Sequence, residues 1–185
     1  MFNLRVQQAV DALLAGGVVA YPTEAVYGLG CMPLEVGAVM RLLAIKNRST
    51  DKGLILIGAD LAQFENMVRM PEPPLADEIF SSWPGPVTWL LPASSWVPHW
   101  LTGGRETLAV RVTDHPLAAE LCRRCDSPLV SSSANRAGRA PLRSALAVRR
   151  QLGTEIDYLL AGSLGGQSRP SEIRDGRTGQ VIRSS

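Results

Sequence analysis

The sequence has little of what many catalytic sites are built from. Its 185 residues include only two histidines, and it has no G-x-x-x-x-G-K-[ST] phosphate loop, complete G-x-G-x-x-G, H-E-x-x-H or G-x-S-x-G motif. His99 lies among prolines and tryptophans and His115 at the start of a predicted helix, which suits packing or surface roles better than catalysis. These absences argue against a hydrolytic triad.

Cysteine is also scarce, and its odd count of three argues against a disulfide framework and favours a reducing compartment. Cys122 and Cys125 form a C-x-x-C inside a predicted helix, but no second pair or histidine partner follows. Two thiols on one helix face explain this spacing more simply than a metal or redox centre. The sequence shows no signal peptide and no apolar run long enough to span a membrane. We therefore expect a cytoplasmic protein.

Lysine is nearly absent, because Lys46 and Lys52 are the only two among the 19 basic residues. They flank Arg48 in the stretch IKNRSTDKGLILI, and Asp51 is the only acid between them. Three cations this close repel each other unless an anion lies among them, and ammonium and guanidinium groups both suit phosphate. The cluster indicates a polyphosphate clamp or, equally well, favourable charge at a helix C-terminus.

The formal net charge of +2 is unevenly distributed. Residues 1–100 carry 6 basic and 9 acidic side chains, and residues 101–185 carry 13 and 8. The two parts therefore differ in sign, at −3 and +5. This asymmetry favours an anionic partner such as a nucleotide or RNA, with a solvated arginine-rich face as the alternative.

The length and the hydrophobic share of 45% predict one domain with a sizeable core. Apolar spacing predicts helices over 3–17, 33–48, 114–125 and 144–153, with one or two more within 61–82. Apolar runs predict strands over 18–24, 54–58, 87–93, 108–112, 128–132 and 157–162, and residues 170–184 read as a hairpin. This alternation predicts an α/β domain whose twisted, mixed sheet, parallel and antiparallel, is flanked by helices.

Polar residues follow two of the predicted strands. Ser131, Ser133 and Asn135 come at the end of PLVSSSAN, and Thr23 comes at the end of VVAYPTE. Ligands of open α/β sheets bind beyond strand ends, and hydroxyl and amide groups suit phosphate or ribose. An ordinary turn with local side-chain bonds is the alternative.

Arg111 stands inside the apolar strand LAVRV. A buried charge is costly unless it is paired. We expect Arg111 to bind a substrate carboxylate, with an ion pair to a protein acid such as Glu24 as the alternative.

Six segments together resemble one family. They are YPTEAVYGLG, K-x-R at Lys46 and Arg48, WPGPVT at 83–88, LAVRVTDHP, SSSAN and PSEIRD. In this order they resemble the YrdC/Sua5 family of threonylcarbamoyl-AMP synthases, from about residue 8 onward. The length is similar to that of the short, bacterial TsaC-type members. The resemblance implies a single YrdC-like domain over residues 1–185, with a concave, positively charged surface.

The resemblance also implies a reaction. Such enzymes join L-threonine, bicarbonate or carbon dioxide, and ATP into threonylcarbamoyl-AMP and pyrophosphate, with Mg²⁺ sharing the phosphates. A downstream t6A transferase complex of the TsaB/TsaD/TsaE type then modifies adenosine 37 in tRNAs that read ANN codons. The resemblance leaves direct binding of tRNA or double-stranded RNA open.

The family's ligand residues match positions in this sequence. On the threonine side they are Thr23, Arg111, Ser131 and Ser171. On the ATP side they are Lys46, Arg48, Lys52, Thr107, Ser133, Asn135, Pro141 and Arg183. Lys46 and Arg48 would act in catalysis by stabilising charge on the departing pyrophosphate. Two positions depart from the family pattern, because Lys52 replaces an asparagine and Ile57 a histidine.

Two other interpretations remain open. One is a non-catalytic module that binds double-stranded RNA or tRNA through phosphate contacts. The other is an enzyme that forms a different carbamoyl or acyl adenylate. Amino-acid dependence of pyrophosphate release separates these from the synthase.

Overall fold

The computed structural model describes residues 2–184, with Phe2 described by its backbone alone. Within this range one nine-stranded sheet has the order β7-β1-β2-β6-β3-β5-β4-β8-β9. Three neighbouring pairs are parallel (β1·β7, β3·β5 and β4·β8) and the rest are antiparallel, so the predicted mixed sheet is confirmed. The strands are β1 (Val19–Pro22), β2 (Tyr27–Cys31), β3 (Ile55–Gly58), β4 (Val87–Pro92), β5 (Thr107–Val112), β6 (Leu129–Ser133), β7 (Tyr158–Leu159), β8 (Glu172–Asp175) and β9 (Val181–Arg183).

The helices flank this sheet as the sequence predicts. They are α1 (Phe2–Leu14), α2 (Val36–Lys46), α3 (Leu75–Ser82), α4 (His99–Thr102), α5 (Pro116–Arg124) and α6 (Ala145–Leu152), with short 3₁₀ turns η1 (Thr50–Lys52) and η2 (Leu61–Phe64). The predicted C-terminal hairpin is confirmed as β8 and β9. The sequence did not reveal β2 or α4.

The missed strand β2 has a physical explanation. Its sequence, YGLGC, contains two glycines and lacks the β-branched residues typical of strands. A side-chain carbon on Gly30 would lie 2.5 Å from the Val130 carbonyl oxygen and 2.7 Å from the Tyr21 ring. Glycine is therefore required at this position because β1 and β6 both approach β2 closely. Since glycine has a low strand propensity, the sequence did not predict this strand.

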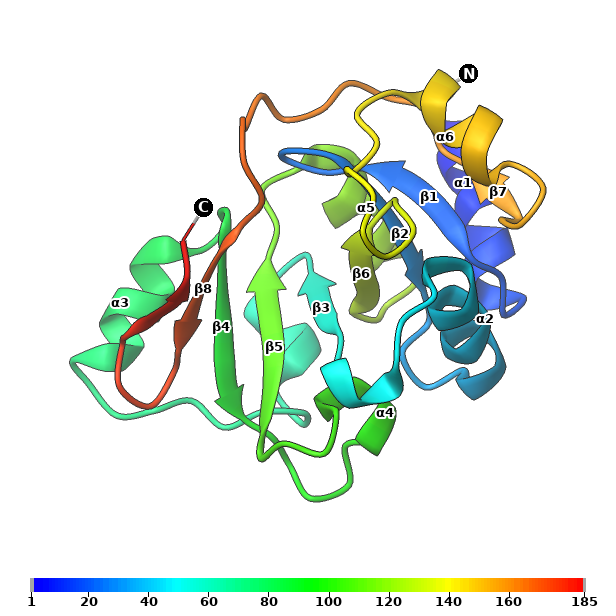
Figure 1. Cartoon of the computed structure of the whole chain (residues 1–185). Coiled ribbons are helices and arrows are strands. Elements are labelled where there is room, and N and C mark those ends of the chain that lie inside the picture. The colour runs from blue at the N-terminus through cyan, green and yellow to red at the C-terminus, as the bar shows by residue number, and fades with distance from the viewer. Residues whose placement is uncertain (1, 185) are drawn as a thin grey trace.

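Two apolar clusters lie on opposite faces of the sheet. Helices α1 and α5 cover one face, where Val10, Leu13 and Leu121 pack against Val19 and Ile57. The opposite face carries the larger cluster, which includes side chains from α2 and α3. In Figure 1, α1 and α2 lie at the same end of the sheet and α3 lies at the other.

Helix α5 covers only part of its face. Leu129 and Ile57 are paired in the sheet and belong to the cluster under α1 and α5. Two residues further along, Ser131 pairs with Ile55, and Ile55 pairs with Ala109. Alternate residues point to the same face, so this second row lies on the same side as the first but beyond the helix. The row forms the floor of the cavity described below.

A long connection between β7 and β8 runs across the sheet and contacts the β1–β2 turn (Figure 1). Residues 160–171 cross from one end of the sheet to the other, drawn in orange in Figure 1. The Gly165 amide donates to the Thr23 carbonyl at 3.1 Å, and the Gln167 amide to the Glu24 carbonyl at 2.9 Å. These bonds hold the connection against the β1–β2 turn. Among residues 2–184, none of the helices has the length and apolarity needed to cross a membrane.

Candidate active site

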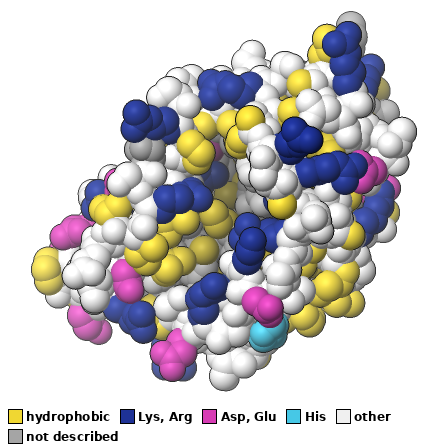
Figure 2. All heavy atoms as spheres, in the orientation of Figure 1, with side chains coloured by type: hydrophobic (Ala, Val, Ile, Leu, Met, Phe, Trp, Pro, Cys, Tyr) yellow, Lys and Arg dark blue, Asp and Glu magenta, His cyan; other side chains and the backbone are white. Residues whose placement is uncertain are grey.

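A cavity of about 430 Å³ lies over the uncovered part of the sheet. Its volume is in the range of small-molecule sites. Its walls come from the β1–β2 turn, the α2–β3 loop, β5, β6 and the segment that leads into β8. Figure 2 shows Lys and Arg side chains around a hollow with an apolar interior.

The described lining is strongly cationic. Glu24 is its single acid, and six basic residues share the lining: Arg48, Lys52, Arg105, Arg111, Arg169 and Arg183. Like charges this close cost free energy without an anion to offset them. The cavity is therefore suited to a ligand with several negative charges.

Arg48 is held at the cavity wall by its own loop. Its guanidinium donates to the Gly53 carbonyl at 2.9 Å and to the Lys52 carbonyl at 3.3 Å. Its Nε is buried without a hydrogen-bond partner. Burial, followed by the charges of Arg105 and Arg183, lowers the pKa of Arg48. These three cations therefore act on one another across the space where an anion would bind.

Lys46 lies behind the cavity wall, outside the lining. Its side chain is buried, and Nζ donates to the Ser133 carbonyl, to the Asn135 carbonyl at 3.0 Å and to Asn135 Oδ1 at 3.3 Å. Ser133 Oγ also donates to Asn135 Oδ1, at 2.6 Å. Burial, with a smaller effect from Arg48, lowers the pKa of Lys46 to about 8. Lys46 thus fixes the polar loop after β6.

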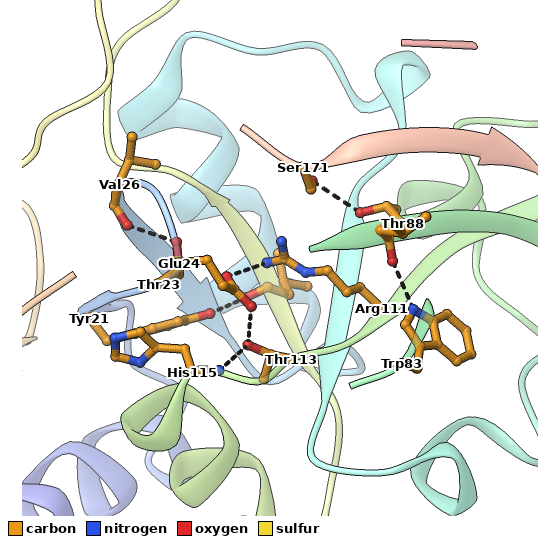
Figure 3. Close-up of polar contacts among 12 residues, drawn as sticks. Tyr21, Thr23, Glu24, Val26, Trp83, Thr88, Arg111, Thr113, His115 and Ser171 are labelled. Atoms are coloured by element: carbon orange, nitrogen blue, oxygen red, sulfur yellow. Dashed lines mark hydrogen bonds and ion pairs between the residues drawn. The ribbon is translucent and has the colours of Figure 1, made fainter. Parts of the chain in front are cut away.

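The opposite wall carries hydroxyl groups and a buried ion pair. Figure 3 shows Glu24 facing Arg111, the Thr23 hydroxyl directed at the Val26 carbonyl, and Ser171 at the segment that enters β8. Thr23 Oγ1 donates to the Val26 carbonyl at 2.8 Å, which fixes the β1–β2 turn. Ser171 Oγ accepts from Thr88 Oγ1 at 3.1 Å. These bonds hold both hydroxyl groups in defined positions at the wall.

Arg111 pairs with a protein acid in this structure. Its Nη2 lies 3.3 Å from Glu24 Oε2, and both side chains are almost fully buried. Glu24 Oε1 accepts from Thr113 Oγ1 at 2.6 Å. Burial alone would raise the pKa of Glu24, but the charge of Arg111 and the Thr113 bond hold it below its usual value. The ion pair that the sequence left as the alternative is therefore present, and Arg111 also lines the cavity.

The structure brings most of the sequence-predicted site residues to this one cavity. Lys46 and Asn135 stand behind its wall, and Ile57 is buried under α5. The lining includes Thr23, Arg48, Lys52, Thr107, Arg111, Ser131, Ser133, Pro141, Ser171 and Arg183.

Sequence reasoning missed Arg105, Arg169 and Gln167, which also line the cavity. Arg105 comes just before β5, and β5 runs parallel to β3 with Ala109 beside Ile55. That pairing brings Arg105 close to the α2–β3 loop. Only the pairing of β3 with β5 would have identified Arg105 as a cavity residue, and the sequence did not predict which strands pair.

The described residues offer no metal site of their own. No group of three or more His, Cys, Asp or Glu side chains within residues 2–184 is arranged to hold an ion. The one carboxylate of the cavity lining, Glu24, is paired with Arg111.

The chain is thus a single α/β domain with a cationic cavity on its sheet. A model of the Sua5/YciO/YrdC family, described as "Telomere recombination", matches residues 11–185. The chain is 53% identical over 181 residues to the threonylcarbamoyl-AMP synthase of Nitrosococcus oceani, covering 98% of each chain. It is 54% identical to the threonylcarbamoyl-AMP synthase of Halorhodospira halophila, covering 97% of this chain and 94% of that one. The chain belongs to the Sua5/YciO/YrdC family.

Solved structures agree with this assignment. E. coli YciO superposes with a TM-score of 0.85 at 25% identity, over 99% of this chain and 89% of that one. P. abyssi Sua5 in complex with L-threonine superposes with a TM-score of 0.81 at 35% identity. That match covers 92% of this chain and 50% of the longer Sua5 chain.

Proposed function

We propose that this protein is an L-threonylcarbamoyladenylate synthase, a nucleotidyltransferase. It converts L-threonine, bicarbonate or carbon dioxide, and ATP into threonylcarbamoyl-AMP and pyrophosphate. The observation that carries the proposal is the 53% identity to a threonylcarbamoyl-AMP synthase across 98% of both chains. The cationic cavity supplies the physical basis, because it suits a substrate with several phosphates.

The cavity divides into two sides that suit the two larger substrates. Arg48, Lys52, Arg105 and Arg183 would gather the ATP phosphates, and Thr107, Ser133 and Pro141 would complete the nucleotide side. Thr23, Arg111, Ser131 and Ser171 would hold threonine. The L-threonine complex of P. abyssi Sua5 supports this amino acid as the substrate. Mg²⁺ would enter as the ATP complex, since the described lining offers only one carboxylate.

The chemistry needs positioning and charge more than a protein nucleophile. The threonine amine attacks the carbon of carbon dioxide, a C–N bond forms, and protons leave to solvent. A carbamate oxygen then attacks the α-phosphorus, and the bond to the bridging oxygen of the β-phosphate breaks. The electron pair leaves with pyrophosphate, where Arg48 and its neighbouring cations stabilise the developing charge.

Lys46 takes an indirect part in this proposal. It holds the Ser133–Asn135 loop through three acceptors, so it would shape the nucleotide side from behind the wall. Asn135 belongs to the same support. Lys46 thus supports a catalytic site whose direct phosphate contacts come from Arg48.

The product would pass to a t6A transferase complex of the TsaB/TsaD/TsaE type, in the cytoplasm, for attachment to adenosine 37 of tRNAs that read ANN codons. Direct tRNA contact would use exposed arginines outside the cavity, such as Arg139, Arg149 and Arg150. RNA binding that survives Arg48→Ala but weakens steeply with salt would support that contact. The same RNA binding without any turnover by the wild type would favour a non-catalytic RNA module.

The test of the proposed function follows pyrophosphate release in the presence of ATP, Mg²⁺ and bicarbonate. Release that requires L-threonine and falls at least 100-fold in Arg48→Ala is the expected result, since a charge at the leaving group is worth about 3 kcal/mol or more. Arg69→Ala is the matched control, because Arg69 is exposed and outside the lining. Release that responds equally to other amino acids would identify a different adenylate-forming enzyme.

A further inference from the structure

Glu24 is the one acid in a cavity lining that is otherwise cationic. It is 3% exposed and comes from the β1–β2 turn, and Figure 3 shows it facing Arg111 of β5. The Thr113 hydroxyl fixes one carboxylate oxygen, Oε1. That hydroxyl in turn accepts from the His115 amide at 3.2 Å. The Asp114 carboxyl also interacts with the Glu24 carboxylate, and burial, followed by the charge of Glu24, raises the pKa of Asp114. The second oxygen of Glu24, Oε2, is directed at Arg111.

The ion pair between these residues is incomplete. Glu24 Oε2 and Arg111 Nε are both buried without a hydrogen-bond partner. The separation of 3.3 Å between Oε2 and Arg111 Nη2 is long for a charge-assisted bond. Buried polar atoms are nearly always hydrogen-bonded, so each such exception needs an explanation. Here the exceptions are one acceptor and one donor that belong to the two oppositely charged members of this ion pair, and both residues line the cavity.

A ligand that satisfies both atoms must carry a cationic donor and an anionic acceptor close together. The zwitterion of an α-amino acid has this arrangement, because one carbon atom carries both its ammonium and its carboxylate. The charge of Arg111 keeps the pKa of Glu24 low despite burial, so the carboxylate is anionic at neutral pH. Hydroxyl groups of Thr23 and Ser171 line the same wall and suit the remainder of a small polar amino acid.

We infer that Glu24 binds the α-ammonium of the substrate while Arg111 binds its carboxylate, so that the internal ion pair opens and each member takes the complementary charge of the ligand. This inference rests on the proposed function and adds to it the residue that recognises the amine. Glu24 would thereby restrict the site to α-amino acids. It would also set the position of the nitrogen that becomes the carbamate.

The test compares two ligands that differ at the amine alone. L-threonine and (2S,3R)-2,3-dihydroxybutanoate, in which a hydroxyl replaces the ammonium, are titrated calorimetrically into wild type and Glu24→Gln. The wild type should prefer threonine. Glu24→Gln should lose about 30-fold or more in threonine affinity, as expected when one member of a buried charge pair is removed, with the hydroxy acid unaffected. Glu24→Asp, which keeps the charge, should recover part of the preference.

Other outcomes overturn the inference. If Glu24 serves only to hold Arg111, Glu24→Gln weakens both ligands in parallel. Equal affinity of the wild type for the two ligands contradicts it as well. Glu106→Gln is the control, because the Glu106 side chain is 94% exposed. ATP affinity measured on each variant reports whether the cavity is intact.

Pyrophosphate release by the wild type separates this inference from the proposed function. If the wild type turns over threonine while Glu24→Gln keeps its preference for the amine, the inference fails alone. If the wild type releases no threonine-dependent pyrophosphate, the proposed function is contradicted, and the inference that rests on it falls with it.

Discussion

Lys46 and Arg48 are two residues apart, yet only Arg48 faces the cavity. Helix α2 ends at Lys46, and Asn47 adopts a left-handed conformation with φ of 50° that turns the chain. Lys46 therefore stays behind the wall and binds the Ser133–Asn135 loop, while Arg48 reaches the opening. The two cations of one short motif thus have different positions, one buried behind the wall and one in the cavity lining.

The position of Lys46 predicts a pH dependence. Its pKa of about 8 means that Nζ loses its proton, and with it one donor and the charge, as the pH rises through 8. The loop after β6 then loosens, so ATP affinity should fall between pH 7 and 9, by about tenfold. Lys46→Ala should bind ATP weakly at both values. A wild-type affinity that does not change over this range would contradict the support role.

The folded protein favours the neutral form of Lys46, because its pKa lies below the usual value of 10.5. The unfolded chain therefore holds more protons between pH 8 and 10.5. The contribution of Lys46 to the free energy of unfolding should consequently rise with pH across that window. Denaturant titrations of wild type and Lys46→Met in the window measure this slope, and a fall in the wild type relative to the variant would contradict it.

Arg105 supplies a third residue-scale prediction. It is exposed at the cavity lining, and its charge acts on Arg48. Arg105→Ala should raise the KM for ATP by about tenfold, the ~1.4 kcal/mol expected for a lost bond to a charged group. The KM for threonine should stay unchanged, because Arg105 would lie on the nucleotide side. Equal changes in the KM values for ATP and threonine would contradict this prediction, because they would indicate that Arg105 supports the shape of the whole cavity.

At the scale of elements, the site depends on close pairing of β2 with its neighbours. Gly30 pairs with Ser131 of β6 and with Val19 of β1. The missing side chain at Gly30 lets the Tyr21 ring lie close to the strand. This contact fixes the register that presents Ser131 on the cavity floor.

Gly30→Ala should therefore lower the free energy of unfolding by about 2–3 kcal/mol, because the added carbon overpacks the sheet against backbone. Gly37→Ala on α2 is the matched control, since no atom lies within 4 Å of the added carbon. It should stabilise the protein by about 0.5 kcal/mol through helix propensity. Urea denaturation measures both changes, and equal stabilities of the two variants would contradict the packing account.

At the scale of the whole molecule, the sequence predicted the layered α/β architecture because its apolar periodicities are strong. The hairpin of β8 and β9 was predicted from its turn residues instead. The sequence did not predict strand β2, because close packing requires glycine there and glycine is not typical of strands. It did not predict helix α4 either, because a helix of four residues is too short to show an apolar periodicity.

The site was predicted less completely than the fold. Motif resemblance identified residues on both sides of the cavity, but it did not separate Lys46, which stands behind the wall, from Arg48, which lines it. That distinction depends on the turn at Asn47, whose left-handed conformation no periodicity reveals. Arg105 depends on strand pairing. The sequence named Glu24 only as the alternative partner of Arg111, and the choice between Glu24 and a substrate carboxylate depends on the path of the chain in three dimensions.

The proposed reaction incorporates the carbon atom of bicarbonate into the product, so an isotope label can follow it. The purified protein is incubated with ATP, Mg²⁺, L-threonine and [¹³C]bicarbonate, and the nucleotide products are analysed by mass spectrometry. The expected product is threonylcarbamoyl-AMP that carries the ¹³C label, formed together with pyrophosphate and absent when threonine is omitted. A folded, ATP-binding protein that yields no labelled adenylate would contradict the proposed function.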